Sequence, residues 1–126
     1  MPMAKLPPPP HFRTLLCVSL LVAAPLAHAG EIKTLMKDMK LAMQGAMSST
    51  TIPELRGYVT RLESDAQRAS HQPYRSDPST YDEGMQALQQ ELAEVDRAIQ
   101  ADDMDAAKRA LRRINGTRKH YHDLLG

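Results

Sequence analysis

The sequence predicts an all-α protein, an up-down-up-down antiparallel four-helix bundle. Four segments carry apolar residues at helical spacing, and none has the alternating pattern of a β-strand. Capping residues and prolines separate these segments. The first and second segments are joined by a short connector, as are the third and fourth, so each pair forms antiparallel neighbours. The longer middle connector is compatible with the same topology.

Residues 1–29 have the pattern of a cleavable secretory signal peptide. Lys5 and Arg13 make a basic leader before an uncharged run, residues 14–26, that is rich in Leu, Val and Ala. Small residues two apart then follow at Ala27 and Ala29. Because the run is shorter than the ~20 apolar residues of a membrane-spanning helix, a retained anchor is the weaker interpretation. The chain is therefore predicted to be exported.

Cleavage after Ala29 would leave a single domain, residues 30–126, with no cysteine. Cys17 lies early in the apolar run and not beside the cleavage point, so no lipid anchor is expected. Exported chains of this size are often held by disulfides. A helical core, alone or with a cofactor, must therefore stabilise this one.

The charge of the exported part gives no indication of a polyanionic partner. Without Lys5 and Arg13, 14 of the 16 basic residues remain against 15 acidic ones, and both signs are interspersed. We therefore expect no binding to nucleic acid and none to a membrane after the leader is removed. The polar helix faces show no obvious apolar patch, so a monomer is expected.

The first helix is predicted from about Glu31 to Met47, and the longest connector, from His71 to Ser79, contains Pro73 and Pro78. Capping boxes pair Thr51 with Glu54 and Thr80 with Glu83, and Asp102 or Asp103 caps the fourth helix. The apolar stripes are Ile32, Leu35, Met36, Met39, Met43 and Met47 in the first helix; Ile52, Leu55, Val59, Leu62, Ala66 and Ala69 in the second; Tyr81, Met85, Leu88, Leu92, Val95 and Ile99 in the third; and Met104, Ala107, Leu111, Ile114, Tyr121 or His122, and Leu125 in the fourth.

Three histidines follow the leader, and helical phase separates two of them. His71 lies in the connector, where a solvated side chain is expected. At ~100° per residue, His122 is about 20° around the helix from Leu111, whereas His120 is about 180° away. His122 is therefore predicted to face the core and His120 the solvent. A single core-facing histidine is more often a hydrogen-bonded structural residue than a ligand.

The predicted topology brings Met36 and His122 to the same end of the bundle, on facing helices. A thioether and an imidazole so placed can bind the two axial positions of one haem iron. The alternative for Met36 is simple packing, because methionine fills irregular gaps in a core and this helix has four in line. Helical position alone leaves both interpretations open.

Several residues give the chain a resemblance to the soluble cytochrome b562 family. They are the run from Thr117 to His122, Met36 near the start of the first helix, and Gly84 in the third. The resemblance covers essentially all of residues 30–126. It implies one noncovalently bound haem b, with Met36 and His122 as its axial ligands, and places Arg118 and Tyr121 near the haem edge.

The sequence departs from the family where aromatic side chains of the third helix often meet the porphyrin, since the matching positions here are Tyr81 and Met85. It lacks a Cys-x-x-Cys-His motif, which excludes c-type attachment of the usual kind. The resemblance implies a periplasmic electron carrier without enzymatic activity, which exchanges electrons with periplasmic redox partners that the sequence does not identify.

Two other functions stay open. The first is a Cu(I) site formed by Met36, Met39, Met43 and Met47, because soft thioethers select that ion and the four share one helix face. These are, however, also the main core residues of that helix. The second is a haem-free helical binding or chaperone-like protein whose charged helices contact a partner.

Overall fold

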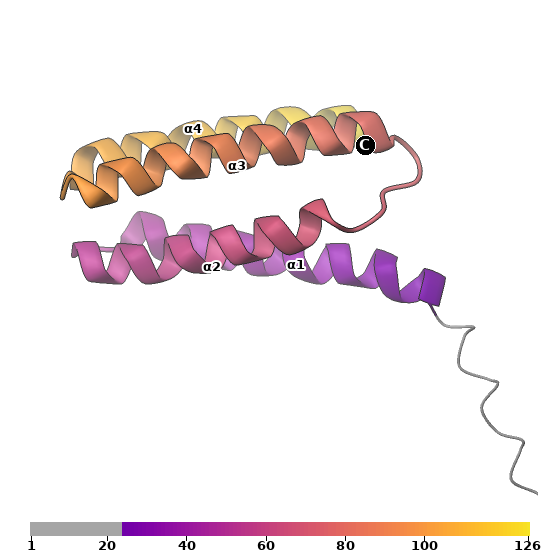
Figure 1. Ribbon diagram of the computed structural model, residues 1–126, viewed down its shortest axis with the longest axis horizontal. Helices are drawn as coiled ribbons and strands as arrows, with labels where there is room; N and C mark the ends of the chain where they lie inside the picture. The colour runs from indigo at the N-terminus through magenta and orange to yellow at the C-terminus, as the bar shows by residue number, and fades with distance from the viewer. Residues whose placement is uncertain (1–23) are drawn as a thin grey trace, which may run out of the picture.

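The computed structural model describes residues 24–126, with side chains from residue 30 onward. Most of the predicted signal peptide, residues 1–23, lies outside the described residues. Within the described part, the chain forms only helices and connectors (Figure 1). The four helices are α1 (Ala24–Ser48), α2 (Ile52–Ser70), α3 (Pro78–Gln100) and α4 (Met104–Leu125). The predicted all-α, up-down-up-down bundle is confirmed.

Helix α1 begins before the predicted start at Glu31. Its backbone continues without a break through the predicted cleavage point after Ala29. The added residues, 24–29, include three alanines, which have the highest intrinsic helix propensity, so the helix extends into them when they are present.

Capping side chains set the starts of α2 and α4 as predicted. The Thr51 hydroxyl accepts a hydrogen bond from the Glu54 amide at 3.3 Å. The Glu54 carboxylate in turn accepts one from the Thr50 amide at 2.9 Å. At the start of α4, the Asp103 carboxylate accepts from the Ala106 amide at 2.9 Å. Each cap provides a partner for a backbone N–H that the first helical turn leaves unpaired.

The predicted start of α3 at a Thr80–Glu83 capping box is wrong. Asp77 caps this helix, and its carboxylate accepts from the Thr80 amide at 3.2 Å. Pro78 is the first helical residue, where its fixed φ suits a helix and its missing N–H costs nothing. The connector therefore ends at Asp77 and not at Ser79, as was predicted.

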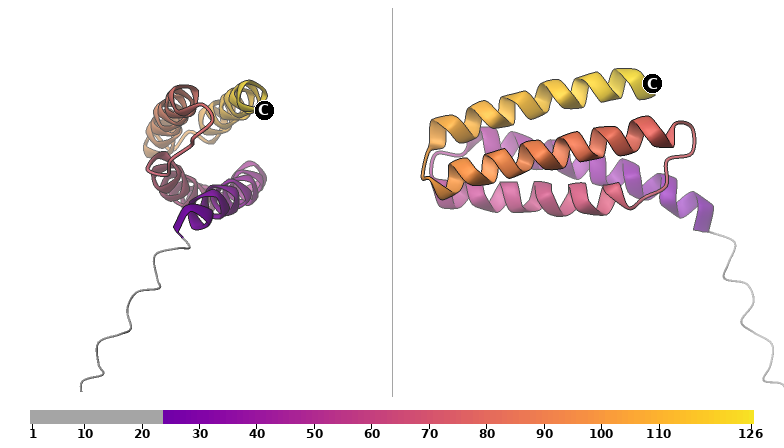
Figure 2. Two further views of the ribbon diagram at one scale, coloured as in Figure 1. Left: turned by 90° about the vertical axis from the view of Figure 1, so that its right-hand side faces the viewer. Right: turned by 45° about the horizontal axis from the view of Figure 1, so that its top comes forward.

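The four helices form an open arrangement and not a closed square. Helix α2 packs against α1 on one side and α3 on the other, and α4 packs against α3, whereas α1 and α4 touch very little. Viewed along their axes in Figure 2, the helices form a C with α1 and α4 at its two ends. The most deeply buried side chains along the inside of this C include Leu55, Val59, Leu92, Leu111 and Ile114.

Within residues 24–126, no helix combines the length and the apolar character that spanning a bilayer requires.

Candidate functional site

Helices α1 and α4 are tied together at one end only. The Lys108 ammonium, near the start of α4, donates hydrogen bonds to the carbonyl oxygens of Met47 at 2.9 Å and Ser49 at 2.5 Å. Beyond this tie the two helices stand apart, toward the end of the bundle where α1 begins and α4 finishes (Figure 2). We refer to this side of the bundle, between α1 and α4, as the open side.

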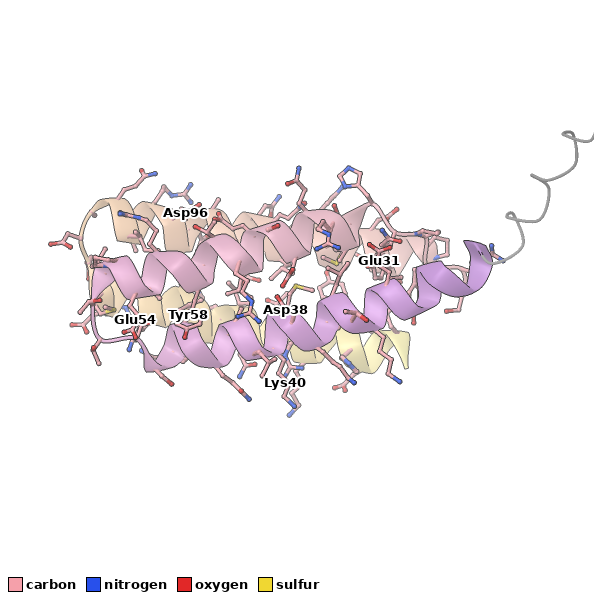
Figure 3. All side chains as sticks on the ribbon, turned by 90° about the horizontal axis from the view of Figure 1, so that it is seen from below. Glu31, Asp38, Lys40, Glu54, Tyr58 and Asp96 are labelled. Carbon is pink, nitrogen blue, oxygen red and sulfur yellow. The ribbon has the colours of Figure 1, made fainter. Side chains whose placement is uncertain are left out.

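Met36 lies on α1 at the edge that borders the open side. Asp38 points from α1 toward α2, where it pairs with Arg61 (Figure 3). Because Met36 precedes Asp38 by two residues, it is about 160° around the helix axis and so faces away from α2. Its side chain is 37 % exposed, unusual for a large apolar residue of this bundle. Met36 is therefore partly exposed on this edge.

His122 also borders the open side, but it is exposed, so the prediction that it faces the core is wrong. The buried stripe of α4 runs through Ala107 and Ile114. His122 is about 60° and 80° around the axis from them, so it lies at the edge of the stripe. It is about 40° from Lys108, whose side chain reaches α1. His122 therefore faces the side of α1, which is too far away to cover it.

The tie at Lys108 fixes the relative heights of Met36 and His122. With a rise of ~1.5 Å per residue, Met36 lies roughly 17 Å along α1 from Met47. His122 lies roughly 21 Å along α4 from Lys108 in the same direction. The two side chains are therefore level to within about one helical turn, one on each side of the opening.

The other two predicted cofactor residues are neighbours on α4, about 60° apart around its axis, but they differ in burial. Arg118 is exposed, and its Nε donates to Asn115 Oδ1 at 3.4 Å. Tyr121 is half-buried against α3, so close to Gly84 that a Cβ atom there would lie 2.9 Å from Tyr121 Cγ. Tyr121 thus packs between α3 and α4, and its predicted contact with a haem edge stays a prediction.

His120 is exposed, as predicted. It lies about 160° around the axis of α4 from His122. There it lines a shallow groove of about 640 Å³ between α3 and α4, together with Glu91 and Tyr121. The two histidines are therefore on opposite sides of one helix, and only His122 borders the open side.

Comparison with known proteins decides the family. The family model described as Cytochrome b562 matches residues 31–125, nearly the whole described part of the chain. The chain belongs to the cytochrome b562 family. No curated protein matches it. Membership implies a haem-binding b-type cytochrome, which agrees with the resemblance of the run from Thr117 to His122.

The residues at the open side of this cytochrome b562 homologue fit a haem. They supply a sulfur and an imidazole donor from two helices, level with each other and uncovered. Apolar side chains of all four helices lie behind them, among them Leu35, Leu62 and Met85. Among the described residues, no group of three or more His, Cys, Asp or Glu side chains is placed to hold a metal ion. A porphyrin between α1 and α4 would cover surface that the helices leave open.

The four methionines of α1 do not form one uniform row. Met39 is buried in the core at 9 % exposure, and Met43 and Met47 are partly buried against it, whereas Met36 is exposed. A Cu(I) site that used all four thioethers would therefore need to draw core side chains toward the surface. Copper binding stays an untested alternative.

Sequence reasoning missed two features beside the site. Tyr74, in the connector, stacks on Tyr81 with ring centroids 4.9 Å apart, and its hydroxyl donates to the Leu125 carbonyl at 3.5 Å. This contact joins the connector to the end of α4. Burial raises the pKa of Tyr81 to about 12, and its hydroxyl donates to the Ala69 carbonyl at 2.7 Å.

The second missed feature is a pair of carboxyl groups between α1 and α2. Asp65 is 5 % exposed, and its Oδ2 has no hydrogen-bond partner among the described residues. Burial and the neighbouring Asp38 carboxylate raise the pKa of Asp65 to about 6. Hydrogen bonds from Arg61, with a further contribution from Asp65, hold the pKa of Asp38 well below its ordinary value. No local motif marks such a pair, because it exists only once α1 packs on α2.

Proposed function

We propose that this protein is a periplasmic electron carrier that holds one noncovalent haem b between α1 and α4, with Met36 and His122 as axial ligands. The observation that carries the proposal is the placement of these two donors, level and uncovered on the open side. Family membership supports it independently. When bound, the haem supplies one-electron chemistry at its iron.

The protein residues would bind the cofactor and set its potential. Met36 and His122 would occupy both axial positions, which leaves none for a substrate and fits a carrier without enzymatic activity. A thioether ligand favours the reduced iron and raises the potential. The apolar side chains behind them would exclude water from the porphyrin face, and Arg118 is a candidate partner for a haem propionate. The leader, residues 1–29, supports export to the periplasm.

Absorption spectroscopy tests haem binding directly. Protein purified from haem-supplied cells is expected to show a Soret band and, on reduction, the sharp α-band of a low-spin haem. Added haemin should produce the same spectrum in haem-free protein. If neither preparation gives it, the electron-carrier function is wrong.

Two histidine variants test the ligand. We expect His122→Ala to abolish the low-spin spectrum, because it removes the imidazole on the open side. His120→Ala is the matched control, a histidine of the same helix on the opposite side, and should leave the spectrum unchanged. Equal effects of the two variants would contradict the assignment of His122. Met36→Leu, which keeps the apolar volume, should yield a haem that lacks the thioether ligand and has a lower reduction potential.

A further inference from the structure

Both signs of charge are interspersed along this chain and its net formal charge is only +1, but helices α3 and α4 differ in charge. Helix α3 has five acidic residues and one arginine, whereas α4 has six Lys and Arg and two Asp. These two helices lie side by side, with α4 at the border of the open side and α3 behind it. Helix α4, which borders the opening, is therefore the more positive of the two helices.

Basic side chains flank each of the two donors at the open side. Lys33 and Lys40 are three residues before and four residues after Met36, and at that spacing helical side chains are neighbours on one face. Figure 3 shows Lys40 on the edge of α1 away from α2. Both Lys33 and Lys40 are exposed.

The same spacing recurs on α4, where Arg118 and Lys119 precede His122 by four and three residues and are exposed. We call the set of Lys33, Lys40, Arg118 and Lys119 the basic rim. Its members come from both helices and surround the opening on two sides.

Neighbouring acidic side chains do not neutralise the two rim lysines of α1, because these acids form ion pairs with arginines of α2. The carboxylate of Asp38 is bound by the Arg61 guanidinium through two hydrogen bonds. The Glu31 carboxylate lies 3.5 Å from Arg68. Both pairs lie between α1 and α2, away from the open side. The carboxylates of α1 are thus engaged with α2, while its lysines on the other edge face solvent.

We infer that the basic rim is the docking surface for an acidic patch on a redox partner protein. This inference rests on the proposed function, because the rim matters for electron transfer only if the haem lies at the open side. A bound haem has two propionates, and the exposed Asp123 lies four residues after Lys119 on the same face of α4, so together they offset at most three of the four charges. The remaining charge would steer an acidic partner to the edge where the haem is nearest to solvent.

The observations favour a protein partner over a lipid surface. An interfacial helix needs an apolar face beside its basic residues. The largest exposed apolar residues other than Met36 are Leu41 and Leu124. They lie about 140° around α1 from Met36 and about 160° around α4 from His122. Neither is beside the rim, so Met36, which the proposed function assigns to the haem, is the one exposed large apolar side chain of the described residues that lies there.

Electron transfer to small probes of opposite charge tests the rim. The reduced, haem-loaded protein gives one electron to hexacyanoferrate(III), an anion, or to tris(phenanthroline)cobalt(III), a cation. At low ionic strength we expect Lys33→Glu with Lys40→Glu to slow the reaction with the anion about tenfold and not to slow the reaction with the cation. Added salt should slow the reaction of the unmodified protein with the anion, because screening weakens steering.

The matched control is Arg56→Glu with Arg97→Glu, which changes net charge equally at exposed positions of α2 and α3. It should alter the rate with the anion less than about twofold. Equal slowing in the two double variants would overturn the inference, because net charge alone would then explain the effect. So would a rate with the anion that rises with salt in the unmodified protein, a measurement that needs no variant to fold.

A titration that needs no haem separates this inference from the proposed function. We expect poly-L-glutamate to shift the amide NMR signals of the rim residues in haem-free protein, and to bind about tenfold more weakly to the Lys33→Glu, Lys40→Glu variant. If polyglutamate binds the rim but no haem spectrum is obtained, the proposed electron carrier is refuted, whereas a surface that binds acidic chains remains. A normal haem spectrum without rim binding would refute the docking surface alone. Binding to phosphatidylglycerol vesicles but not to polyglutamate would overturn it in favour of a lipid surface.

Discussion

The Lys108 ammonium donates to the Met47 carbonyl at 2.9 Å, and this bond closes one end of a bundle that is open along the rest of its α1–α4 side. This bond also affects the positions of residues at the other end of the bundle. Because both helices are rigid rods measured from this tie, it sets Met36 and His122 at one level. A haem that bridges α1 and α4 would then complete the fourth interface of the bundle, which side chains alone leave incomplete.

Lys108→Met should destabilise the protein by about 1–2 kcal/mol. The variant keeps most of the apolar stem but leaves the carbonyl groups of Met47 and Ser49 without their charged donor. Urea unfolding of the haem-free protein measures this as a lower midpoint at an unchanged slope. Lys37→Met, at an exposed position of α1, should change the free energy of unfolding by less than about 0.5 kcal/mol. If the free energy of unfolding falls by a similar amount in both variants, the hydrogen bonds of Lys108 do not specifically stabilise the protein.

Gly84→Ala should cost stability, whereas Gly57→Ala should add it. A Cβ atom at Gly84 would lie 2.9 Å from Cγ and 3.0 Å from Cδ1 of Tyr121, too near the backbone of Tyr121 for the ring simply to rotate away. Overpacking of this kind costs about 1–3 kcal/mol, which exceeds the helix propensity gained. At Gly57, on the exposed side of α2, nothing lies within 4 Å, so the gain of up to about 1 kcal/mol remains.

A double variant identifies the cause. Tyr121→Ala removes the ring that the new methyl group would meet, so Gly84→Ala should be harmless or stabilising when introduced into Tyr121→Ala. The coupling between the two positions is read from a thermodynamic cycle of urea midpoints. If Gly84→Ala costs the same with and without the ring, the close approach to Tyr121 is not the reason for the glycine.

The fold could be predicted because its determinants are local. The spacing of Leu55, Val59 and Leu62 on one helix, and the cap at Thr51, are visible in short stretches of sequence and suffice to place α2. The start of α3 was predicted wrongly because two local cap signals overlap there, Thr80 with Glu83 and Asp77 with Pro78. Asp77 followed by Pro78 is the stronger of them, because the proline is already set in the helical conformation.

The candidate site was only partly predictable, because it depends on distances between helices. Leu111 is itself at the edge of the buried stripe that borders the open side, so a phase measured from it alone put His122 into the core. Nothing in the sequence indicates how far α1 stands from α4. The acid pair of Asp38 and Asp65 is likewise a product of packing, since the two residues are far apart in the chain and on different helices.

The buried Asp65 should make stability depend on pH between about 4 and 6. Its pKa is about 6 in the folded protein against an ordinary value of 3.8, so the folded state binds more protons in this range. The free energy of unfolding therefore falls as the pH rises through the window. Asp65→Asn resembles the protonated group at every pH. Its stability relative to the unmodified protein should rise by about 1–2 kcal/mol between pH 4.5 and pH 8 in urea unfolding.

A second acid provides the control for this pH dependence. Burial and the neighbouring Asp96 raise the pKa of Glu63, between α2 and α3, to about 7 from an ordinary value of 4.5. Glu63→Gln should therefore remove the part of the pH dependence that extends toward pH 7 and leave the part due to Asp65. A pH profile of Asp65→Asn that runs parallel to that of the unmodified protein would show that Asp65 is ionised in the folded state across the whole range.

Amide hydrogen exchange should reveal which part of α4 needs the haem. The last buried residue of this helix is Ile114, and most side chains after it are exposed, so residues 115–125 have fewer tertiary contacts than residues 107–114, chiefly those of Tyr121 and Leu125. In haem-free protein their amides should exchange faster than those of residues 107–114. Haem ligated by His122 would add a contact to this segment, so saturating haemin should slow exchange there the most. In His122→Ala, exchange in residues 115–125 should stay fast with haemin present. If haemin instead slows exchange in this variant as much as in the unmodified protein, the end of α4 is ordered by something other than ligation.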